Sequence, residues 1–294
     1  MSDQDQVEWE ARAGRPAAVA AFAAAVLLLA GTFTLQSIIK NRAGLEPLPD
    51  FLVSIDDKPS TMLASQILLG LSGLSLIGVF YFLFRAILHR TPQFPRWFLY
   101  MILIGPVLYA SSLVIGAVDR IDVAHTFVDK TSHIKHCPAI AGKAGDDCAN
   151  ELLKHDINPL TVGLGLGGQV ATAFLFVMLP LRARRAGLMS QFMAILGVVA
   201  GALLVLRLMP LIPEIVQAFW LGAVGALFLG RWPGGRGPAW ATGQADPWPT
   251  NAQRRGLVPA GRGGESSNGA AAEPDEPEPV PQRASSRKRR RKKR

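Results

Sequence analysis

The sequence predicts an all-α integral membrane protein, a bundle of six transmembrane helices followed by a disordered basic C-terminal tail. Three observations indicate this fold class: six long apolar stretches, loops that alternate between purely basic and mixed charge, and an abrupt change of composition after residue 230. A helix needs about 20 residues to cross a hydrocarbon core about 30 Å thick. No stretch alternates with a period of two residues, so helices rather than strands are indicated.

The predicted helices cover residues 16–39, 59–84, 97–118, 157–181, 186–206 and 212–230. Only the last range contains a charged residue, Glu214. The first stretch is longer than the apolar core of a cleaved signal peptide, which has about 7–15 residues, and acidic residues precede it. We therefore expect a retained first helix after a short cytoplasmic N-terminus, residues 1–15.

The charges of the loops predict the orientation, because Lys and Arg concentrate in short cytoplasmic loops. Residues 85–96 and residues 182–185 each contain three arginines and no acid. Residues 40–58 carry both signs, and the long segment 119–156 has five Lys/Arg against seven Asp/Glu. These patterns place 119–156 in an outer loop, both termini in the cytoplasm and the protein in the cell membrane.

The outer loop contains the only two cysteines, Cys137 and Cys148. Because compartments outside the cytoplasm are oxidising, we predict a disulfide between them. Closing this loop would contribute about 2–3 kcal/mol. Free thiols and a metal site are the alternatives, but the nearby histidines follow no zinc spacing. We therefore predict neither a metal nor a cofactor.

Arg207 and Glu214 flank a short proline-containing link between the fifth and sixth predicted helices. Charges inside a membrane domain are candidates for function. A cation at the end of one helix and an anion after Pro213 at the start of the next also fit ordinary helix ends. Two interpretations stay open: helix ends at the outer interface, or an intramembrane polar pair.

Several small or polar residues in the apolar stretches predict contacts between helices. The run from Gly163 to Gly168 matches the glycine pattern of dinucleotide sites, but it follows no strand and no acid lies about 20 residues on. Small residues let helices approach closely, so we interpret the run as a packing seam, either within the chain or in a homo-oligomer. The glutamines are expected to bond between helices rather than line a substrate path: Gln36, Gln66, Gln169 and Gln217.

The tail, residues 231–294, contains 14 of the 31 Lys/Arg, 9 glycines and 9 prolines, so it is expected to be disordered. Its three tryptophans, Trp232, Trp240 and Trp248, are expected either to lie along the inner membrane surface or to dock against the cytoplasmic helix ends. The last eight residues are all basic: Arg287, Lys288, Arg289, Arg290, Arg291, Lys292, Lys293 and Arg294. Anionic inner-leaflet lipid or a nucleic acid is the expected partner, unless the run is only an anchor.

No catalytic motif is present, and we predict no catalytic residue. Because the distinctive chemistry lies outside the apolar stretches, the leading hypothesis is a non-enzymatic scaffold or accessory membrane protein. The alternatives are a small transporter or channel that uses Arg207 and Glu214, and an intramembrane enzyme.

Overall fold

The structure, a computed structural model, describes residues 2–39, 48–133, 143–156, 158–206, 211–233 and 235–249. The chain divides into a compact unit, Met1–Trp248, and a second unit, Pro249–Arg294. Nearly all of the second unit lies outside the described residues. The predicted basic run, Arg287–Arg294, is among these and stays a prediction.

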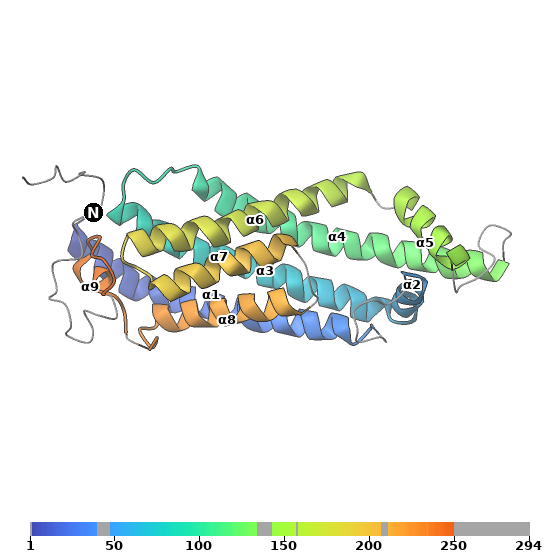
Figure 1. Cartoon of the computed structure of the whole chain (residues 1–294), viewed down its shortest axis with the longest axis horizontal. Helices are drawn as coiled ribbons and strands as arrows, with labels where there is room; N and C mark the ends of the chain where they lie inside the picture. The colour runs from blue at the N-terminus through green and yellow to red at the C-terminus, as the bar shows by residue number, and fades with distance from the viewer. Residues whose placement is uncertain are drawn as a thin grey trace, which may run out of the picture. The chain divides into compact units, whose positions relative to one another are not determined.

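Every regular element in the described part of the chain is an α-helix (Figure 1). The helices are α1 (Asp3–Gln36), α2 (Leu48–Asp57), α3 (Pro59–Arg90), α4 (Phe98–His133), α5 (Lys143–Asp156), α6 (Pro159–Arg185), α7 (Gln191–Leu206), α8 (Ile212–Phe228) and α9 (Ala239–Thr242).

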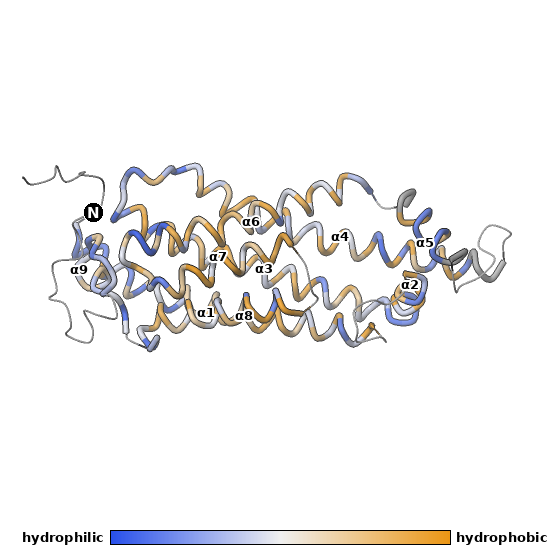
Figure 2. Tube along the Cα trace, viewed as in Figure 1, coloured by the Kyte–Doolittle hydropathy of each residue, from blue (hydrophilic) through white to orange (hydrophobic). Residues whose placement is uncertain are grey.

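Four of these helices are long and apolar enough to cross a bilayer: α1, α3, α4 and α6. Helices α7 and α8 are equally apolar but have only 16 and 17 residues, which at 1.5 Å per residue gives about 24 Å and 26 Å. Figure 2 shows that hydrophobic residues run along all six helices. The membrane character expected from the sequence is therefore supported by four candidate spans and two shorter apolar helices.

The six apolar helices form a closed ring. Among the described residues, α1 contacts α3, α3 contacts α4, α4 contacts α6, α6 contacts α7, α7 contacts α8, and α8 returns to α1. The pair α3–α6 makes the single contact across the ring. Each helix therefore has two ring neighbours, and the interior lies between six apolar faces.

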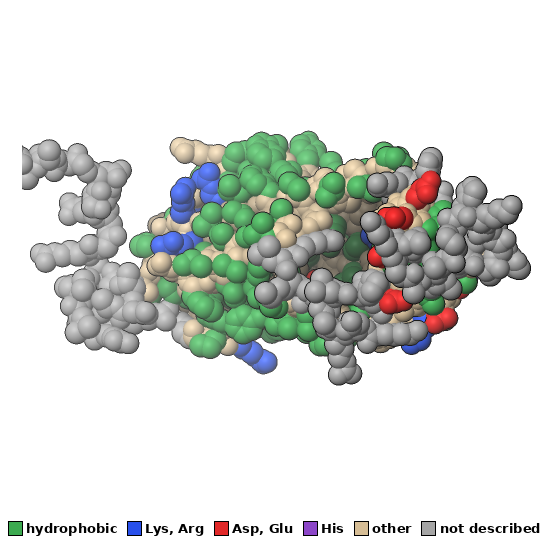
Figure 3. Space-filling view, turned by 45° about the vertical axis from the view of Figure 1, so that its right-hand side comes forward, with side chains coloured by type: hydrophobic (Ala, Val, Ile, Leu, Met, Phe, Trp, Pro, Cys, Tyr) green, Lys and Arg blue, Asp and Glu red, His purple; other side chains and the backbone are tan. Residues whose placement is uncertain are grey.

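The two ends of the ring differ in charge (Figure 3). Arginines gather at the end that also holds the N-terminus and α9 in Figure 1, and we name it the basic end. Acidic side chains gather at the opposite end, beside α2 and α5, which we name the acidic end. Hydrophobic side chains cover the surface between them.

Aromatic side chains fill the ring toward the basic end. Phe80 and Phe176 meet edge to face with centroids 5.2 Å apart, and Phe176 lies 5.1 Å from Trp220. The Trp220 indole is fully buried and donates its Nε1–H to the carbonyl of Met193 at 3.0 Å. Large rings with a satisfied polar atom pack densely, so these side chains form an aromatic cluster inside this half of the ring.

The start of the tail differs from the disorder expected after residue 230. Trp240 is 4% exposed, stacks on Phe82 at 5.9 Å and donates Nε1–H to the carbonyl of Leu188 at 2.9 Å. Burial of the apolar area of this tryptophan and the hydrogen bond of its indole nitrogen stabilise the segment despite the glycines and prolines around it. Of the two sequence-based alternatives for the tryptophans, docking against helix ends is the one that the structure shows for Trp240.

A buried ion pair connects this segment to the bundle. Arg90 of α3 donates to both carboxylate oxygens of Glu10 on α1, at 2.5 Å and 3.0 Å, and the two side chains are 0% and 2% exposed. Arg90 also donates to the carbonyl of Ala239 at 2.5 Å, and Gln6 donates to Glu10 at 2.8 Å. Because both charges are paired and hydrogen-bonded, they are tolerated away from water.

Arg236 contacts the segment around Trp240 and Ala239, which we name the docked segment, on the side of α8. Its guanidinium donates to the carbonyls of Leu227 and Phe228 in the last turn of α8, and the Leu227 carbonyl also accepts the N–H of Gly230. The same group lies 5.5 Å from the Trp240 ring centroid. Burial lowers the pKa of Arg236, while Glu10 acts in the opposite direction.

The prediction that residues 119–156 form a loop is wrong for the part of this segment that the structure describes. Helix α4 continues without a break to His133, and α5 follows. Together with α2 they form a second core, whose buried members include Leu52, Ile55, Phe127 and Leu152. Amphipathic patterns in polar segments stabilise helices by packing, which an analysis based on apolar runs misses.

The glycine interpretation is confirmed within the chain. A Cβ added at Gly168 of α6 would lie 2.4 Å from the backbone nitrogen of Tyr109 on α4. Gly201 of α7 meets the Ala173 carbonyl of α6 in the same way, at 2.8 Å. Gly167, one residue before Gly168, has nothing within 4 Å. The small residues thus let α6 approach both of its ring neighbours.

The substitution Gly168→Ala is expected to destabilise the protein by about 1–3 kcal/mol, because the added methyl group meets backbone that cannot move aside. Gly167→Ala is the matched control and is expected to be neutral or stabilising by up to about 1 kcal/mol, because alanine favours the helix. Thermal unfolding of the purified protein in detergent measures both. Equal midpoints for the two variants would contradict the close α4–α6 contact.

Removing one partner of the buried ion pair is expected to cost about 3–5 kcal/mol, because the other charge stays buried. Glu10→Leu is therefore expected to lower the unfolding midpoint strongly, and the double variant Glu10→Leu/Arg90→Met to recover part of the loss. Glu8→Leu, at an exposed position on the same helix, serves as the control. A double variant no better than Glu10→Leu would show that the pair is not coupled.

Candidate functional site

A cavity of about 700 Å³, partly open to the surface, lies in the ring toward the acidic end. Helices α1, α3, α4, α6, α7 and α8 all contribute to its wall, and Phe51 of α2 lies at its margin. This volume falls within the range of small-molecule sites, about 300–1,000 Å³. The polar lining residues are Gln66, Tyr109, Ser112, Arg120, Thr161, Gln169, Glu214 and Gln217.

The cavity forms where the shorter helices end. From α7 only residues near its C-terminus line it, and from α8 only residues of its first two turns. Helices α4 and α6 line it with their middle and N-terminal parts. Leu211, directly before α8, has φ 75°, a left-handed conformation that costs a residue with a side chain about 1–3 kcal/mol. The described residues thus place the cavity beside the end of α7 and the start of α8.

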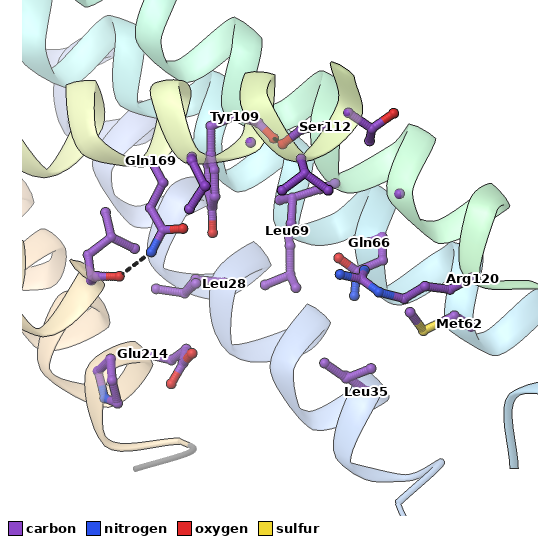
Figure 4. Close-up of a pocket in the computed structure, with 18 of the residues that line it drawn as sticks. Leu28, Leu35, Met62, Gln66, Leu69, Tyr109, Ser112, Arg120, Gln169 and Glu214 are labelled. Atoms are coloured by element: carbon purple, nitrogen blue, oxygen red, sulfur yellow. Dashed lines mark hydrogen bonds between the residues drawn. The ribbon is translucent and has the colours of Figure 1, made fainter. Parts of the chain in front are cut away.

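Three glutamines lie in the wall with 4–8% of their surface exposed. Gln169 of α6 donates to the carbonyl of Leu204 on α7 at 2.5 Å, as Figure 4 shows. The prediction of a glutamine that bonds between helices is confirmed there. Gln66 and Gln217 line the cavity as well, and for them the expectation of bonds between helices rather than a place along a substrate path stays a prediction.

Two neighbouring side chains of α8 present unused hydrogen-bonding atoms. The Oε2 atom of Glu214 and the Nε2 atom of Gln217 are buried, and neither has a hydrogen-bond partner in the described part of the chain. Residues three apart lie on one helix face. Buried polar atoms normally have partners, so an acceptor and a donor are available side by side in the cavity wall.

Arg120 of α4 supplies a positive charge. In Figure 4 the Arg120 and Glu214 side chains extend into the cavity from opposite sides, and Leu69 lies between them in this view. Gln66 lies next to Arg120, and Gln169 lies on the Glu214 side. The wall therefore carries opposite charges at two separate places, with apolar surface between them.

Of the two charged residues predicted near the link between α7 and α8, the structure describes one. Glu214 stands in the first turn of α8 directly after Pro213, as the helix-end interpretation expected. Arg207 lies outside the described residues, so the Arg207–Glu214 pair stays a prediction. Sequence reasoning missed Arg120, because it ended the third apolar helix at residue 118, whereas α4 continues past this arginine.

The cysteine prediction stays open. Cys148 is buried in the second core, at 7% exposure, and Cys137 lies outside the described residues. Asp56 and His125 form a close pair near this core, with 2.5 Å between Oδ1 and Nδ1. Within the described residues, no group of three or more His, Cys, Asp or Glu side chains is arranged to hold a metal ion.

Comparison with known proteins gives no family for this arrangement. No protein-family model matches the sequence, and no curated protein or solved structure is similar to the chain. The cavity and its residues are thus the basis for a functional proposal.

Glu214→Gln is expected to stabilise the protein by about 1 kcal/mol in the absence of a ligand, because it removes a charge whose Oε2 atom is buried without a hydrogen-bond partner in the described residues, and functional sites often sacrifice stability. Glu151→Gln, at an exposed position of α5, removes the same charge and is expected to change stability by less than about 0.5 kcal/mol. Thermal unfolding midpoints compare them. A lower midpoint for Glu214→Gln would mean that Glu214 is stabilised by a partner.

Proposed function

We propose that this protein is a six-span membrane protein of the cell membrane that binds a small molecule in its ring cavity from the extracytoplasmic side, as an outward-open carrier does. The observation that carries this proposal is the asymmetry of the ring interior. Aromatic side chains fill the half toward the basic end, and a polar cavity occupies the half toward the acidic end.

The charges of the two ends support this orientation. Arginines border the hydrophobic surface at the basic end and acids at the other (Figure 3). Since basic residues stay in the cytoplasm, the basic end is cytoplasmic in this proposal. The N-terminus and α9 both lie at that end (Figure 1), which requires an even number of crossings.

Helices α7 and α8 complete the count of six. Each is slightly shorter than a hydrocarbon core of about 30 Å, and local thinning of the bilayer compensates a small mismatch at modest cost. Their exposed faces are apolar, with Phe192, Ile195, Val199, Ile215 and Phe219 each at least 41% exposed. Such faces suit lipid rather than water.

The cavity favours the transporter-like alternative over a scaffold. A scaffold needs contact surfaces, whereas a built interior space with buried polar atoms suits a ligand. The tail begins with a docked segment, so it is not free along its full length. The binding of anionic lipid or nucleic acid through Arg287–Arg294, and assembly into a homo-oligomer, stay separate predictions.

Cysteine substitution tests whether the cavity opens to the outside. Ser112→Cys, in the wall, is expected to react with a membrane-impermeant thiol reagent added to the extracytoplasmic face of intact cells. Ser72→Cys is the matched control, because Ser72 is 4% exposed, donates to the Ala24 carbonyl at 2.8 Å and does not line the cavity. The unmodified chain gives the background labelling.

Labelling of Ser112→Cys only from the cytoplasmic face would reverse the orientation and overturn the proposal. Absence of labelling from either face, with Ser112→Cys folded, would show that the space is closed and does not receive a ligand.

A further inference from the structure

We propose that the ligand of this cavity is an apolar amine, whose ammonium group binds at Glu214 and whose neighbouring oxygen atom accepts a hydrogen bond from Gln217. This inference rests on the proposed function and goes beyond it by naming the chemical class of the ligand. It is carried by two buried polar atoms of α8 that have no hydrogen-bond partner in the described residues, together with the leucines that line the same cavity.

The charge of the ligand is assigned from Glu214. Among the described residues that line the cavity, Arg120 and Glu214 are the charged ones. Arg120 already interacts with another group of the protein, so its charge sets no requirement for a ligand. The Oε2 atom of Glu214 is buried and accepts no hydrogen bond within the described residues. Because a buried charge is tolerated when it is paired, a cation suits this place in the wall.

An ammonium group suits Glu214 better than an inorganic cation does. Its N–H groups donate charge-assisted hydrogen bonds to a carboxylate oxygen. A hard cation such as Ca²⁺ takes about six to eight oxygen ligands, whereas Gln217, one turn further along α8, presents an unpartnered nitrogen. In the part of the chain that the structure describes, no three His, Cys, Asp or Glu side chains are arranged to hold a metal ion. The cation is therefore assigned as organic.

Gln217 adds the requirement for an oxygen atom. Its side chain is 6% exposed, and its Nε2 atom has no hydrogen-bond partner among the described residues. Residues three apart are neighbours on a helix face, yet the Nε2 atom of Gln217 and the Oε2 atom of Glu214 do not bond each other. A ligand with a hydroxyl group beside its amine donates to the carboxylate through nitrogen and accepts from the amide through oxygen.

The apolar part of the ligand is assigned from the leucines of the wall. Leu28 and Leu35 of α1 line the cavity seven residues apart, about 10 Å along the helix (Figure 4). Leu203 and Leu204 of α7 line it as well. Removal of apolar surface from water is favourable, so a hydrocarbon chain attached to the amine strengthens binding along this surface.

Neutral and anionic ligands fit less well. A neutral alcohol bonds to the same polar atoms of α8 but leaves the charge of Glu214 without a partner. A carboxylate places a second negative charge beside Glu214, and burying a charge without a partner is costly. A free amine and the headgroup of an aminophospholipid share the required chemistry, and the experiment below separates these two sources.

Four probes with hydrocarbon chains of the same length test the assignment: 1-amino-2-octanol, octylamine, 1-octanol and octanoate. The purified full chain is titrated with each probe in lipid nanodiscs made of a phosphatidylglycerol. Binding is followed by the rise of the thermal unfolding midpoint above the value without a probe. We expect 1-amino-2-octanol to raise the midpoint most and octylamine to follow, with little effect of 1-octanol and octanoate.

Variants of α8 test the two polar contacts. Glu214→Gln is expected to weaken octylamine binding by at least about tenfold, corresponding to the loss of one charge-assisted hydrogen bond. Gln217→Leu is expected to remove the advantage of 1-amino-2-octanol over octylamine. Glu151→Gln, at an exposed position of α5, is the control for lost charge and is expected to bind as the unmodified chain does. Because all variants are measured in the same discs, the attraction of amines to anionic lipid is common to them.

Nanodiscs that contain a phosphatidylethanolamine separate the two sources of the amine. If the lipid headgroup is the ligand, the unmodified chain unfolds at a higher temperature in these discs before any probe is added, and Glu214→Gln removes the rise. If a free amine is the ligand, the change of disc shifts the midpoints of Glu214→Gln and of the unmodified chain equally.

Equal midpoint shifts for octylamine and 1-octanol would overturn the amine assignment, and so would octylamine binding that Glu214→Gln leaves unchanged. Equal binding of octylamine and 1-amino-2-octanol would overturn the contact assigned to Gln217. These results are compatible with labelling of Ser112→Cys from outside, so failure of this inference is distinguishable from failure of the proposed function.

Discussion

The buried ion pair between Glu10 and Arg90 joins α1, α3 and the docked segment at one place. Its further hydrogen-bond partners are Gln6 of α1, Ala86 of α3 and Ala239 of the docked segment. The desolvation cost of burying two charges is offset only if both stay paired and hydrogen-bonded. The pair therefore demands one specific arrangement of these elements, and the aromatic packing of Phe82 and Trp240 follows from it.

The remainder of the ring divides into a half where aromatic side chains pack and a half that contains the cavity. Close glycine contacts occur in both parts, since Gly168 meets Tyr109 in the cavity wall and Gly201 meets Ala173 next to the aromatic cluster. Toward the acidic end the cavity wall is formed by the last turn of α7 and the first two turns of α8 together with the longer helices.

Apolar runs made the six helices predictable, because the need to satisfy backbone groups in lipid leaves few alternatives. The same method failed at the helix ends. Residues 119–133 are polar, yet they continue α4 because Val123 and Phe127 pack into the second core. Trp240 was placed in a disordered tail because its partners, Phe82 and Leu188, are distant in sequence. Glu214 was recognised because it lies within an apolar stretch, whereas Arg120 was missed because the stretch before it was ended at residue 118.

The unbroken course of α4 also makes it a rigid connection between two parts of the molecule. A continuous helix behaves as a stiff rod, and this one carries Tyr109, Ser112 and Arg120 in the cavity wall and Val123 and Phe127 in the second core. A shift of the second core therefore tilts or slides the cavity wall with it. The wall of the cavity and the surface formed by α2 and α5 are therefore joined by one continuous helix.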